Sequence, residues 1–468
     1  ASMSTLVMKF GGTSVGMTTG LSQVLSIVLY EHERWTNLIL VVSALEGVTD
    51  ALIEAAHLAQ LNNQRGYRRI VATLRTRHLA LIEHLPLGST EKTALQTDLD
   101  RLLYDLLGTC QAVAEHHDDA LRPEVADKIV HVGERLAARI VAALLRQNNL
   151  RGVAIDATDL IITNNAYGNA IPDLALTRER IATHLLPLLQ RGIIPVVTGY
   201  ISSSVTGKPT TLGRGGSDYT ASVLGVGSDA REVWVWTDVD GLMTADPREI
   251  DDARVIPTLS YDEAAELAYF GARILHPRMI HPLREQSIPL RVRNVYTPQQ
   301  PGTLVRDKLA SMLPAIRAVT SIQGLGMSTS HNGPLAPLAQ TVDSMLADLT
   351  GSHTDVTITS QSSSHSFICF VIPTMAGPDA LHSLQVALNQ DEELSAGWNT
   401  RPVQVVTVIG TRLGEIHTLT ANVLLALEGI PLLALSQAPS HCSVSLVVET
   451  QYGETALTRI HNLILKNG

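Results

Sequence analysis

Residues 6–14 read LVMKFGGTS, an apolar run that ends in a lysine and two glycines. An apolar run of this length predicts a buried strand, and the pattern of residues 21–32 predicts a helix after it. Similar strands are expected at residues 37–43, 193–199 and 232–237, with helices from about Asp50 and over Ile129–Leu145. This alternation predicts an α/β fold in which helices cover both faces of a mainly parallel sheet. Residues 62–119 lack strand signals and are expected as a helical excursion from the sheet.

Length, charge and cysteine content limit the number of domains, the kinds of partner and the compartment that are expected. A chain of 468 residues predicts two or three domains. The net charge of −10 argues against a nucleic-acid or membrane-surface partner. Three widely separated cysteines, Cys110, Cys369 and Cys442, favour neither disulfides nor a zinc site and fit a reducing cytosol. We expect a cytoplasmic protein without a membrane segment.

The pattern changes near Pro298–Arg306, which is expected as an extended connector. Beyond it, SQSSSH at residues 360–365 recurs as SQAPSH at residues 436–441. Each copy follows a helical pattern and precedes a strand pattern, which favours an internal repeat. We therefore predict a main domain at residues 3–300, a linker at 301–314, and two small α+β modules at 315–392 and 400–468.

The loop after the first strand suits an anion. Gly11 and Gly12 let the backbone approach a phosphate, and Lys9 at the strand end supplies positive charge. A plain glycine turn between strand and helix is an equal alternative when the motif is taken alone.

A second glycine cluster, LGRGGSD at residues 212–218, surrounds Arg214, whose guanidinium suits a carboxylate. Ser217 and Asp218 are expected at the start of the next helix, where capping is their alternative role. A cap explains one polar residue but not three glycines around an arginine, so we favour a binding function.

Acidic residues also follow the strand at residues 232–237. Thr237 and Asp238 stand where a parallel strand meets a nucleotide, although a polar turn is the competing interpretation. The match of residues 225–230 to G-x-G-x-x-A follows a helix and precedes a strand, the reverse of a dinucleotide site. His116-His117-Asp118-Asp119 is interpreted as a solvated helix face, and no side-chain motif predicts a metal site.

Taken together, these segments resemble the aspartate kinase family of the amino-acid-kinase fold. The matching segments, in the family's order, are KFGGTS (9–14), VVSALEGVTD (41–50), GERL (133–136), PVVTGYI (195–201), TLGRGGSDYTA (211–221), WTDVDGLMTADPR (236–248), LSYDEAAELAYFGARILHP (259–277) and PGT (301–303). The resemblance implies a three-layer αβα kinase domain followed by two ferredoxin-like ACT modules. It also implies transfer of the γ-phosphoryl group of ATP, with Mg²⁺, to the β-carboxylate of L-aspartate.

The resemblance also implies roles for single residues. Lys9 and Asp218 would be catalytic, with Asp218 orienting the lysine and Mg²⁺-ATP. L-Aspartate would be bound by Ser43, Thr49, Glu134, Arg214, Gly215, Gly216 and Ser217, with Glu134 meeting the ammonium and Arg214 a carboxylate. The nucleotide would be bound by Lys9, Phe10, Gly11, Gly12, Thr237, Asp238, Met243, Arg248, Arg273 and Ile274. Mg²⁺ would be bound through the nucleotide.

Four positions depart from the family's pattern. Met243 replaces a usual tyrosine and Arg273 a usual lysine, while Tyr200 replaces phenylalanine and Ser202 replaces glycine. A guanidinium is bulkier than an ammonium, so these changes concern nucleotide geometry more than aspartate recognition.

Paired ACT modules bind amino-acid effectors at their interface, so the resemblance implies feedback by lysine or threonine and a homo-oligomer. The candidate effector residues are Gln361, Ser364, Gln437 and Ser440, while His365 and His441 stand where an acidic residue is common. In such enzymes the first module can be inserted within the second, in which case residues 317–323 pair with the last module.

Two alternatives stay open at this point. One is a kinase of another acidic amino acid in the same fold. The other is an amino-acid-sensing binding protein with a degenerate kinase domain. Met243 and Arg273 favour it, whereas the residues that oppose it are Lys9, Glu134, Arg214 and Asp218. No fused homoserine dehydrogenase is expected within this chain.

Overall fold

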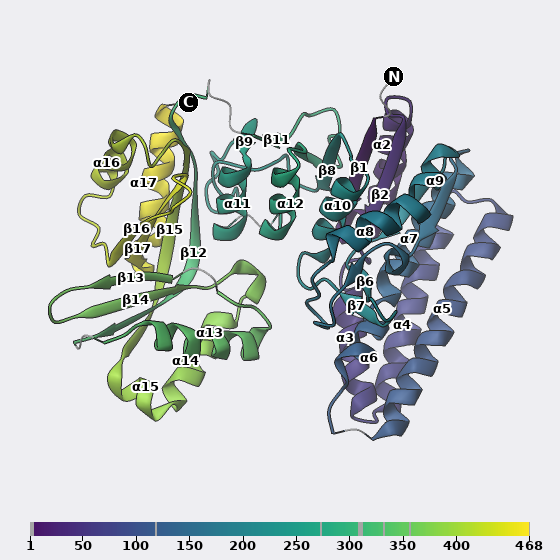
Figure 1. Cartoon of the computed structure of the whole chain (residues 1–468), viewed down its shortest axis with the longest axis horizontal. Helices are drawn as coiled ribbons and strands as arrows, with labels where there is room; N and C mark the ends of the chain where they lie inside the picture. Colours follow the sequence, from purple (N-terminus) through teal and green to yellow (C-terminus); the bar gives the residue numbers. More distant parts are fainter. Residues whose placement is uncertain are drawn as a thin grey trace. The chain divides into compact units, whose positions relative to one another are not determined.

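The computed structural model describes residues 4–117, 119–271, 274–307, 312–330, 333–354 and 357–467. The chain forms two compact units, Ala1–Gly241 with Arg278–Arg306, and Leu242–Pro277 with Asp307–Gly468 (Figure 1). Residues 242–277 thus group with the C-terminal unit although they precede the expected linker. The domain boundaries expected from the sequence remain predictions.

The first unit is built on a mainly parallel sheet with the strand order β3-β5-β2-β1-β8-β10-β11. The strands are β1 (Thr5–Phe10), β2 (Asn37–Val42), β3 (Gly152–Ile155), β5 (Ile194–Thr198), β8 (Glu232–Thr237), β10 (Leu290–Asn294) and β11 (Thr303–Arg306). Pairs from β3 to β10 are parallel, and β11 runs antiparallel to β10. Lys9 on β1 is level with Val41 on β2 and Val235 on β8. The loops after β1, β2, β5 and β8 therefore leave one edge of the sheet.

The central strand β1 is buried on both faces, which explains its unbroken apolar sequence. Leu6, Val7 and Met8 have no exposed surface. Phe10 stacks on Trp236 of β8, with ring centroids 6.2 Å apart. This rigid centre fixes the position of Lys9, the polar residue near the end of β1.

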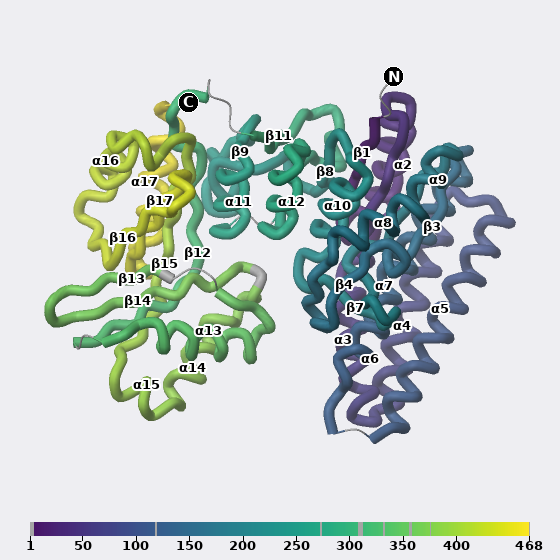
Figure 2. The backbone as a smooth tube through the Cα atoms, in the orientation of Figure 1, coloured from purple at the N-terminus to yellow at the C-terminus, as the bar shows by residue number. Residues whose placement is uncertain are grey.

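Helices cover the sheet and extend beyond it. They are α1 (Gly12–Val15), α2 (Thr18–His32), α3 (Val48–Gln60), α4 (Gln64–Glu83), α5 (Ser89–His116), α6 (Pro123–Val130), α7 (Val132–Gln147), α8 (Leu174–His184), α9 (Leu186–Gln190), α10 (Gly216–Gly227) and α12 (Ile280–Glu285). The predicted helical excursion is confirmed: α4 and α5 pack side by side (Figure 2). A small sheet of β4 (Ile162–Thr163), β6 (Ile201–Ser204) and β7 (Pro209–Thr211) leads into the LGRGGSD loop.

The second unit has an antiparallel sheet with the order β13-β14-β12-β15-β17-β16. Its strands are β12 (Ala315–Thr329), β13 (Thr357–Gln361), β14 (Ser366–Val371), β15 (Asn399–Thr411), β16 (Ala434–Gln437) and β17 (Ser443–Glu449). Its other elements are β9 (Thr258–Ser260), α11 (Tyr261–Phe270), α13 (Ala336–Thr350), α14 (Ala380–Gln390), α15 (Glu392–Gly397), α16 (His417–Ala426) and α17 (Gly453–Lys466). One apolar cluster involves α13 and α14, and another involves α16 and α17. The predicted fold class, a kinase-type α/β fold plus two α+β modules, is confirmed.

The predicted repeat is visible in this sheet. Ser360 and Gln361 end β13, and Ser436 and Gln437 end β16. Each pair is followed by a turn into the neighbouring antiparallel strand. The two copies of the motif therefore occupy equivalent places in the two modules. Residues 318–323 of β12 pair with β15, which in turn pairs with β17, while Arg317 lies at an irregularity of the register.

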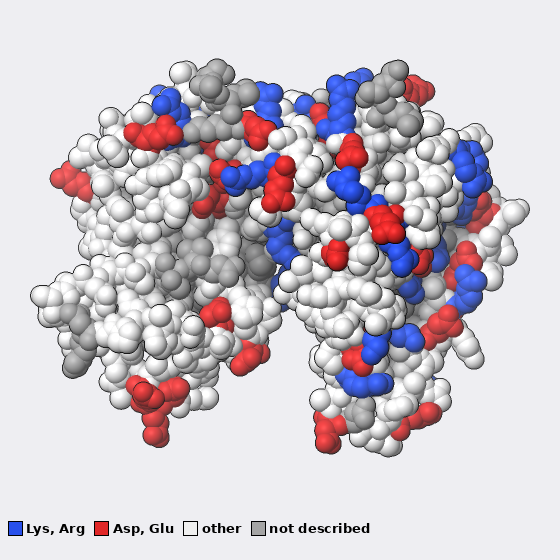
Figure 3. All heavy atoms as spheres, viewed as in Figure 1, with Lys and Arg blue, Asp and Glu red and all other residues white. Residues whose placement is uncertain are grey.

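Among the described residues, no helix combines the length and apolar character needed to cross a membrane. On the face shown in Figure 3, acidic and basic side chains are interspersed.

Candidate active site

A cavity of about 410 Å³ lies in the first unit, where β1, β2, α3, α7 and α10 meet. It is lined by Lys9, Ser43, Ala44, Thr49, Asp50, Ile53, Glu134, Tyr200, Gly213, Arg214, Gly215, Gly216, Ser217 and Asp218. All the residues predicted to bind L-aspartate are therefore brought together here, with both predicted catalytic residues.

The cavity holds a shielded ion pair. Lys9 Nζ of β1 lies 2.9 Å from Asp218 Oδ1 of α10, and their side chains are 14% and 9% exposed. α10 packs against β1, so the pair joins the strand end to the first turn of that helix. An ammonium held in this way supplies positive charge at a fixed point of the cavity.

The KFGGTS loop is held close to the loop after β2. Ser43 N donates to the Phe10 carbonyl at 3.2 Å, and Glu46 N donates to the Gly12 carbonyl at 3.2 Å. A Cβ on Gly12 would lie 2.6 Å from the Ala44 carbonyl oxygen. Glycine is needed at this position because any side chain would push the two loops apart.

Glu134 of α7 is a buried carboxylate, with 2% of its surface exposed. Its Oε1 accepts from Ala44 N at 3.4 Å, whereas Oε2 has no hydrogen-bond partner among the described residues. Burial raises the pKa of Glu134 to about 8, against the effect of its backbone hydrogen bonds. Such a carboxylate is suited to a cationic ligand, which would satisfy the free oxygen and favour the ionised form.

The LGRGGSD loop enters α10 through Gly215, the N-cap residue, which has the left-handed φ of 69°. The alternative role of Ser217 and Asp218 as caps is therefore wrong, because both lie inside the first turn. A left-handed glycine allows the sharp entry that carries Arg214 and Ser217 to the cavity.

Buried residues that the sequence did not single out support this loop. Asp127 of α6 accepts from Gly168 N at 2.8 Å, from Thr211 N at 3.1 Å and from Thr211 Oγ1 at 3.0 Å. His131 Nε2 donates to the Thr210 carbonyl at 2.7 Å. Burial lowers the pKa of His131 to about 3, so the ring is neutral. The two side chains fix β7, the strand directly before LGRGGSD.

Tyr200 also lines the cavity and was noted in the sequence only as a departure from the family. Its backbone is left-handed, with a φ of 71°, and its N–H donates to Thr220 Oγ1 at 3.0 Å. Burial raises the pKa of Tyr200 to about 12. Ala44, Asp50 and Ile53 are further lining residues to which the sequence analysis gave no role in binding.

The predicted nucleotide residues are spread over both units. In the first unit, Phe10 is buried, Gly11 and Gly12 form the loop after β1, and Thr237 Oγ1 donates to Asp238 at 3.3 Å after β8. In the second unit, Met243 forms an isolated bridge with Val255, and Ile274 is half-buried. There the guanidinium of Arg248 makes two hydrogen bonds to Asp246, at 3.1 and 2.6 Å. Arg273 lies outside the described residues. The nucleotide roles remain predictions.

The predicted effector residues differ between the two copies of the repeat. In the first copy, Gln361 donates to Ser366 Oγ at 3.1 Å and Ser364 contacts His365 at 2.8 Å. A cavity of about 350 Å³ adjoins this copy, lined by Ser328, Thr329, Ser330, Ser360, Ser362, His365, Ser366, Phe367 and Asn399.

The second copy instead contacts helix α11. Ser440 Oγ donates to Glu266 Oε1 and Ser443 Oγ donates to Glu266 Oε2, both at 3.0 Å. Burial raises the pKa of Glu266. Gln437 of this copy lies beside Gly414.

The described residues contain no group of three or more His, Cys, Asp or Glu side chains placed to hold a metal ion. The cavity instead combines a lysine-aspartate pair, an arginine and a buried carboxylate that lacks one partner. This set can bind a small zwitterion and can stabilise negative charge that moves between two oxygen atoms.

Comparison with known proteins identifies the family. The profile described as Amino acid kinase family matches residues 4–294. Lysine-sensitive aspartokinase 3 of Escherichia coli (strain K12) is 34% identical, over 70% of this chain and 69% of that protein. Chloroplastic aspartokinase 1 of Arabidopsis thaliana is 31% identical, over 99% of this chain and 81% of that protein.

A solved structure of E. coli aspartokinase III in complex with aspartate and ADP matches with a TM-score of 0.77 at 27% identity, covering 98% of this chain and 99% of that chain. The chain spans about half the length, 50%, of another curated relative, the chloroplastic bifunctional aspartokinase/homoserine dehydrogenase 2 of Arabidopsis thaliana. On the profile match and on the two relatives above 30% identity, the chain belongs to the amino acid kinase family, among the aspartokinases.

Proposed function

We propose that the protein is an aspartate kinase, which converts ATP and L-aspartate into ADP and 4-phospho-L-aspartate. The observation that carries the proposal is the single cavity containing Glu134, Arg214 and the Lys9–Asp218 pair. The match to a structure that holds aspartate and ADP supports it.

In this proposal L-aspartate is recognised by its charges. The free oxygen of Glu134 accepts the substrate ammonium, and Arg214 binds a carboxylate in the bidentate manner that a guanidinium favours. Ser43, Thr49, Ser217 and the N–H groups of Gly215 and Gly216 complete the acceptor site. The bulk of a longer acid such as glutamate has to fit the same cavity of about 410 Å³.

The phosphoryl donor is ATP, held by the loop at Gly11 and Gly12 and by Thr237 and Asp238. Lys9 stabilises charge on the transferred group, and Asp218 keeps the lysine in position. Mg²⁺ would be held through the nucleotide phosphates and would neutralise part of their charge. The acceptor carboxylate is already ionised at neutral pH, so its attack on phosphorus needs no general base.

The decisive experiment is trapping of the acyl phosphate with hydroxylamine in the presence of Mg²⁺-ATP. L-Aspartate, L-glutamate and N-acetylglutamate are compared as acceptors, with the Lys9→Met variant as the control. Hydroxamate formed from aspartate and not from the other acids supports the proposal. Preference for another acid favours the related-kinase alternative. ATP-independent binding of an amino acid without turnover favours the sensing-protein alternative.

We further propose that the modules at residues 315–392 and 400–468 regulate the enzyme. The supporting observations are the repeat, the cavity beside its first copy, and the similarity to a lysine-sensitive aspartokinase. The effector is lysine or threonine, as expected for the first step of lysine, threonine and methionine biosynthesis. The modules also form a homo-oligomer, and the enzyme works in the cytoplasm. If the modules only mediate assembly, millimolar lysine, threonine or methionine will leave kinase activity unchanged.

A further inference from the structure

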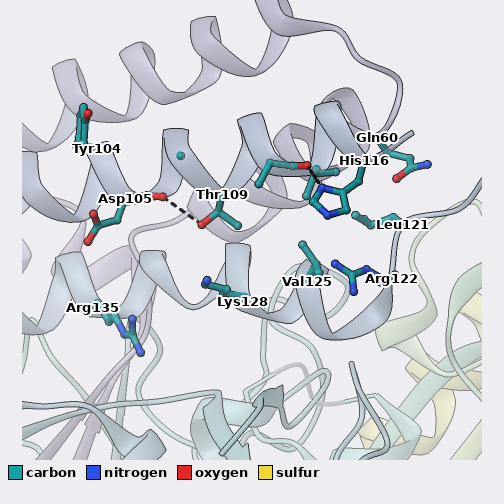
Figure 4. A pocket seen from close by; sticks show the side chains of 13 residues that line it. Gln60, Tyr104, Asp105, Thr109, His116, Leu121, Arg122, Val125, Lys128 and Arg135 are labelled. Atoms are coloured by element: carbon teal, nitrogen blue, oxygen red, sulfur yellow. Dashed lines mark hydrogen bonds between the residues drawn. The ribbon is translucent and has the colours of Figure 1, made fainter. Parts of the chain in front are cut away.

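A second groove lies in the first unit, between α5 on one side and α6 with the start of α7 on the other (Figure 4). Its volume of about 590 Å³ lies within the range of small-molecule sites. None of its lining residues belongs to the aspartate cavity. The groove is therefore a separate feature of the helical part of the molecule.

One wall of the groove is cationic. Arg122, Lys128 and Arg135 line it from the α6–α7 side. Arg122 is paired with Glu124 at 3.8 Å and Arg135 with Asp156 at 3.4 Å, whereas Lys128 makes no ion pair with any described residue. Asp105 is the one carboxylate among the described lining residues. The ammonium of Lys128, set between two guanidinium groups, favours an anionic ligand.

The opposite wall of the groove is formed by small residues of α5. They are Gly108, Thr109 and Ala112, which leave room for a ligand. A Cβ on Gly108 would meet no atom within 4 Å, so open space lies directly above it. Val113 and Val125 add apolar surface. A ligand that fits both walls carries an anionic group beside an apolar portion.

The groove shares its helices with the aspartate cavity. Asp127 in α6 and His131, between α6 and α7, make buried contacts to β7, and Glu134 in α7 makes one to the loop after β2. Lys128 and Arg135 follow Asp127 and Glu134 directly in sequence and line the groove instead. A ligand in the groove would therefore contact the helices that hold Glu134.

We propose that this groove is a second binding site, for a small organic anion that carries a phosphate or carboxylate group next to an apolar portion. Lys128 binds the anionic group, with Arg122 and Arg135 close by. The apolar portion lies over Gly108 and Ala112.

Calorimetric titration of the full chain tests this, with phenyl phosphate and benzoate as anionic probes and benzyl alcohol as the neutral probe. Lys128→Gln is expected to weaken binding of the anionic probes by about tenfold, the effect of losing one charge-assisted contact. Gly108→Leu is expected to abolish binding by filling the groove, and leucine is a better helix former than glycine, so α5 keeps its fold. Lys208→Gln, at an exposed lysine outside both cavities, is the matched control and should bind normally.

Three results would overturn the proposal. They are absence of binding at millimolar probe, unchanged affinity in both Lys128→Gln and Gly108→Leu, and equal affinity for benzyl alcohol. A melting temperature of Gly108→Leu equal to that of the native chain shows that any loss of binding is not due to unfolding. Because phenyl phosphate can also enter the aspartate cavity, a loss of binding in Arg214→Lys with normal binding in Gly108→Leu equally overturns it.

Discussion

Lys9 and Asp218 are more than a charged pair in a cleft, since each is almost fully shielded from water. Lys9→Met is expected to lower kcat by about two to four orders of magnitude, because charge on the transferred phosphoryl group loses its stabilisation. The KM for aspartate should change little. Steady-state kinetics check this, and near-native kcat would refute the role.

The same substitution removes the ion pair of Asp218, a mostly buried carboxylate, which costs stability. The double variant Lys9→Met with Asp218→Asn is therefore the control. It should recover much of the lost melting temperature but none of the activity, which separates the loss of catalysis from a folding defect.

Glu134 gives a pH dependence with a defined sign. Its pKa of about 8 means that most molecules carry a protonated Glu134 at neutral pH, whereas an ammonium ligand requires the ionised form. Aspartate affinity should therefore rise by up to about tenfold per pH unit between pH 6 and 7.5, with release of close to one proton on binding. Calorimetry in two buffers of different ionisation enthalpy measures both. Glu134→Gln should remove the pH dependence, and a flat profile for the native chain would contradict the assignment.

A substitution of Arg214 is expected to show whether aspartate binding depends on its positive charge alone or also on the geometry of the guanidinium. Arg214→Lys keeps the positive charge but loses the fork that binds a carboxylate with two hydrogen bonds. The KM for aspartate should rise well beyond the KM for ATP. If both constants rise equally, Arg214 serves the nucleotide or the fold instead.

At this scale the sequence predicted the charged and glycine residues of the cavity, because their chemistry is specific. Lys9, Glu134 and Arg214 could be proposed from residue type and order, and the structure brings them together. Ala44 and Ile53 could not, since a backbone N–H and an apolar wall leave no distinctive pattern. The cap role of Ser217 failed because the N-cap is Gly215, a left-handed glycine two residues earlier.

Among the elements, β7 depends on a side chain from a helix far away in the sequence. Asp127→Asn is expected to destabilise the protein by about 1–3 kcal/mol, because the amide NH₂ cannot accept from all three donors of Gly168 and Thr211. Urea denaturation measures this, with the exposed Asp229→Asn as a control. The KM for aspartate should also rise, because the loop after β7 carries Arg214. Native-like stability would show that these bonds are easily replaced.

The order of helices and strands was predictable because buried parallel strands have unbroken apolar sequences. The expected strands at residues 6–10 and 232–237 correspond to β1 and β8, and the excursion at 62–119 contains α4 and α5. Less predictable was the grouping of residues 242–277 with the C-terminal unit. Local patterns identify an element, but not the core against which it packs.

For the molecule as a whole, the repeat was the strongest sequence signal of its second half. Two copies of one motif suggest two equal sites, and the strand ends at Gln361 and Gln437 are indeed equivalent in the fold. The residues around the two copies differ, because Glu266 of α11 contacts the second copy. Such differences arise from contacts with a distant helix, which a motif does not encode.

The contacts of Glu266, in α11, bear on how many effector molecules one chain binds. By accepting from Ser440 and Ser443, this carboxylate acts as a ligand that the chain itself supplies to the second copy of the repeat. We therefore propose that only the first copy of the repeat binds an effector, because Glu266 already takes the hydrogen bonds of the second copy. Calorimetric titration with lysine or threonine should accordingly give one bound effector per chain. In Glu266→Ala the value should rise toward two, and two effectors already bound to the native chain would show that the internal ligand is readily displaced.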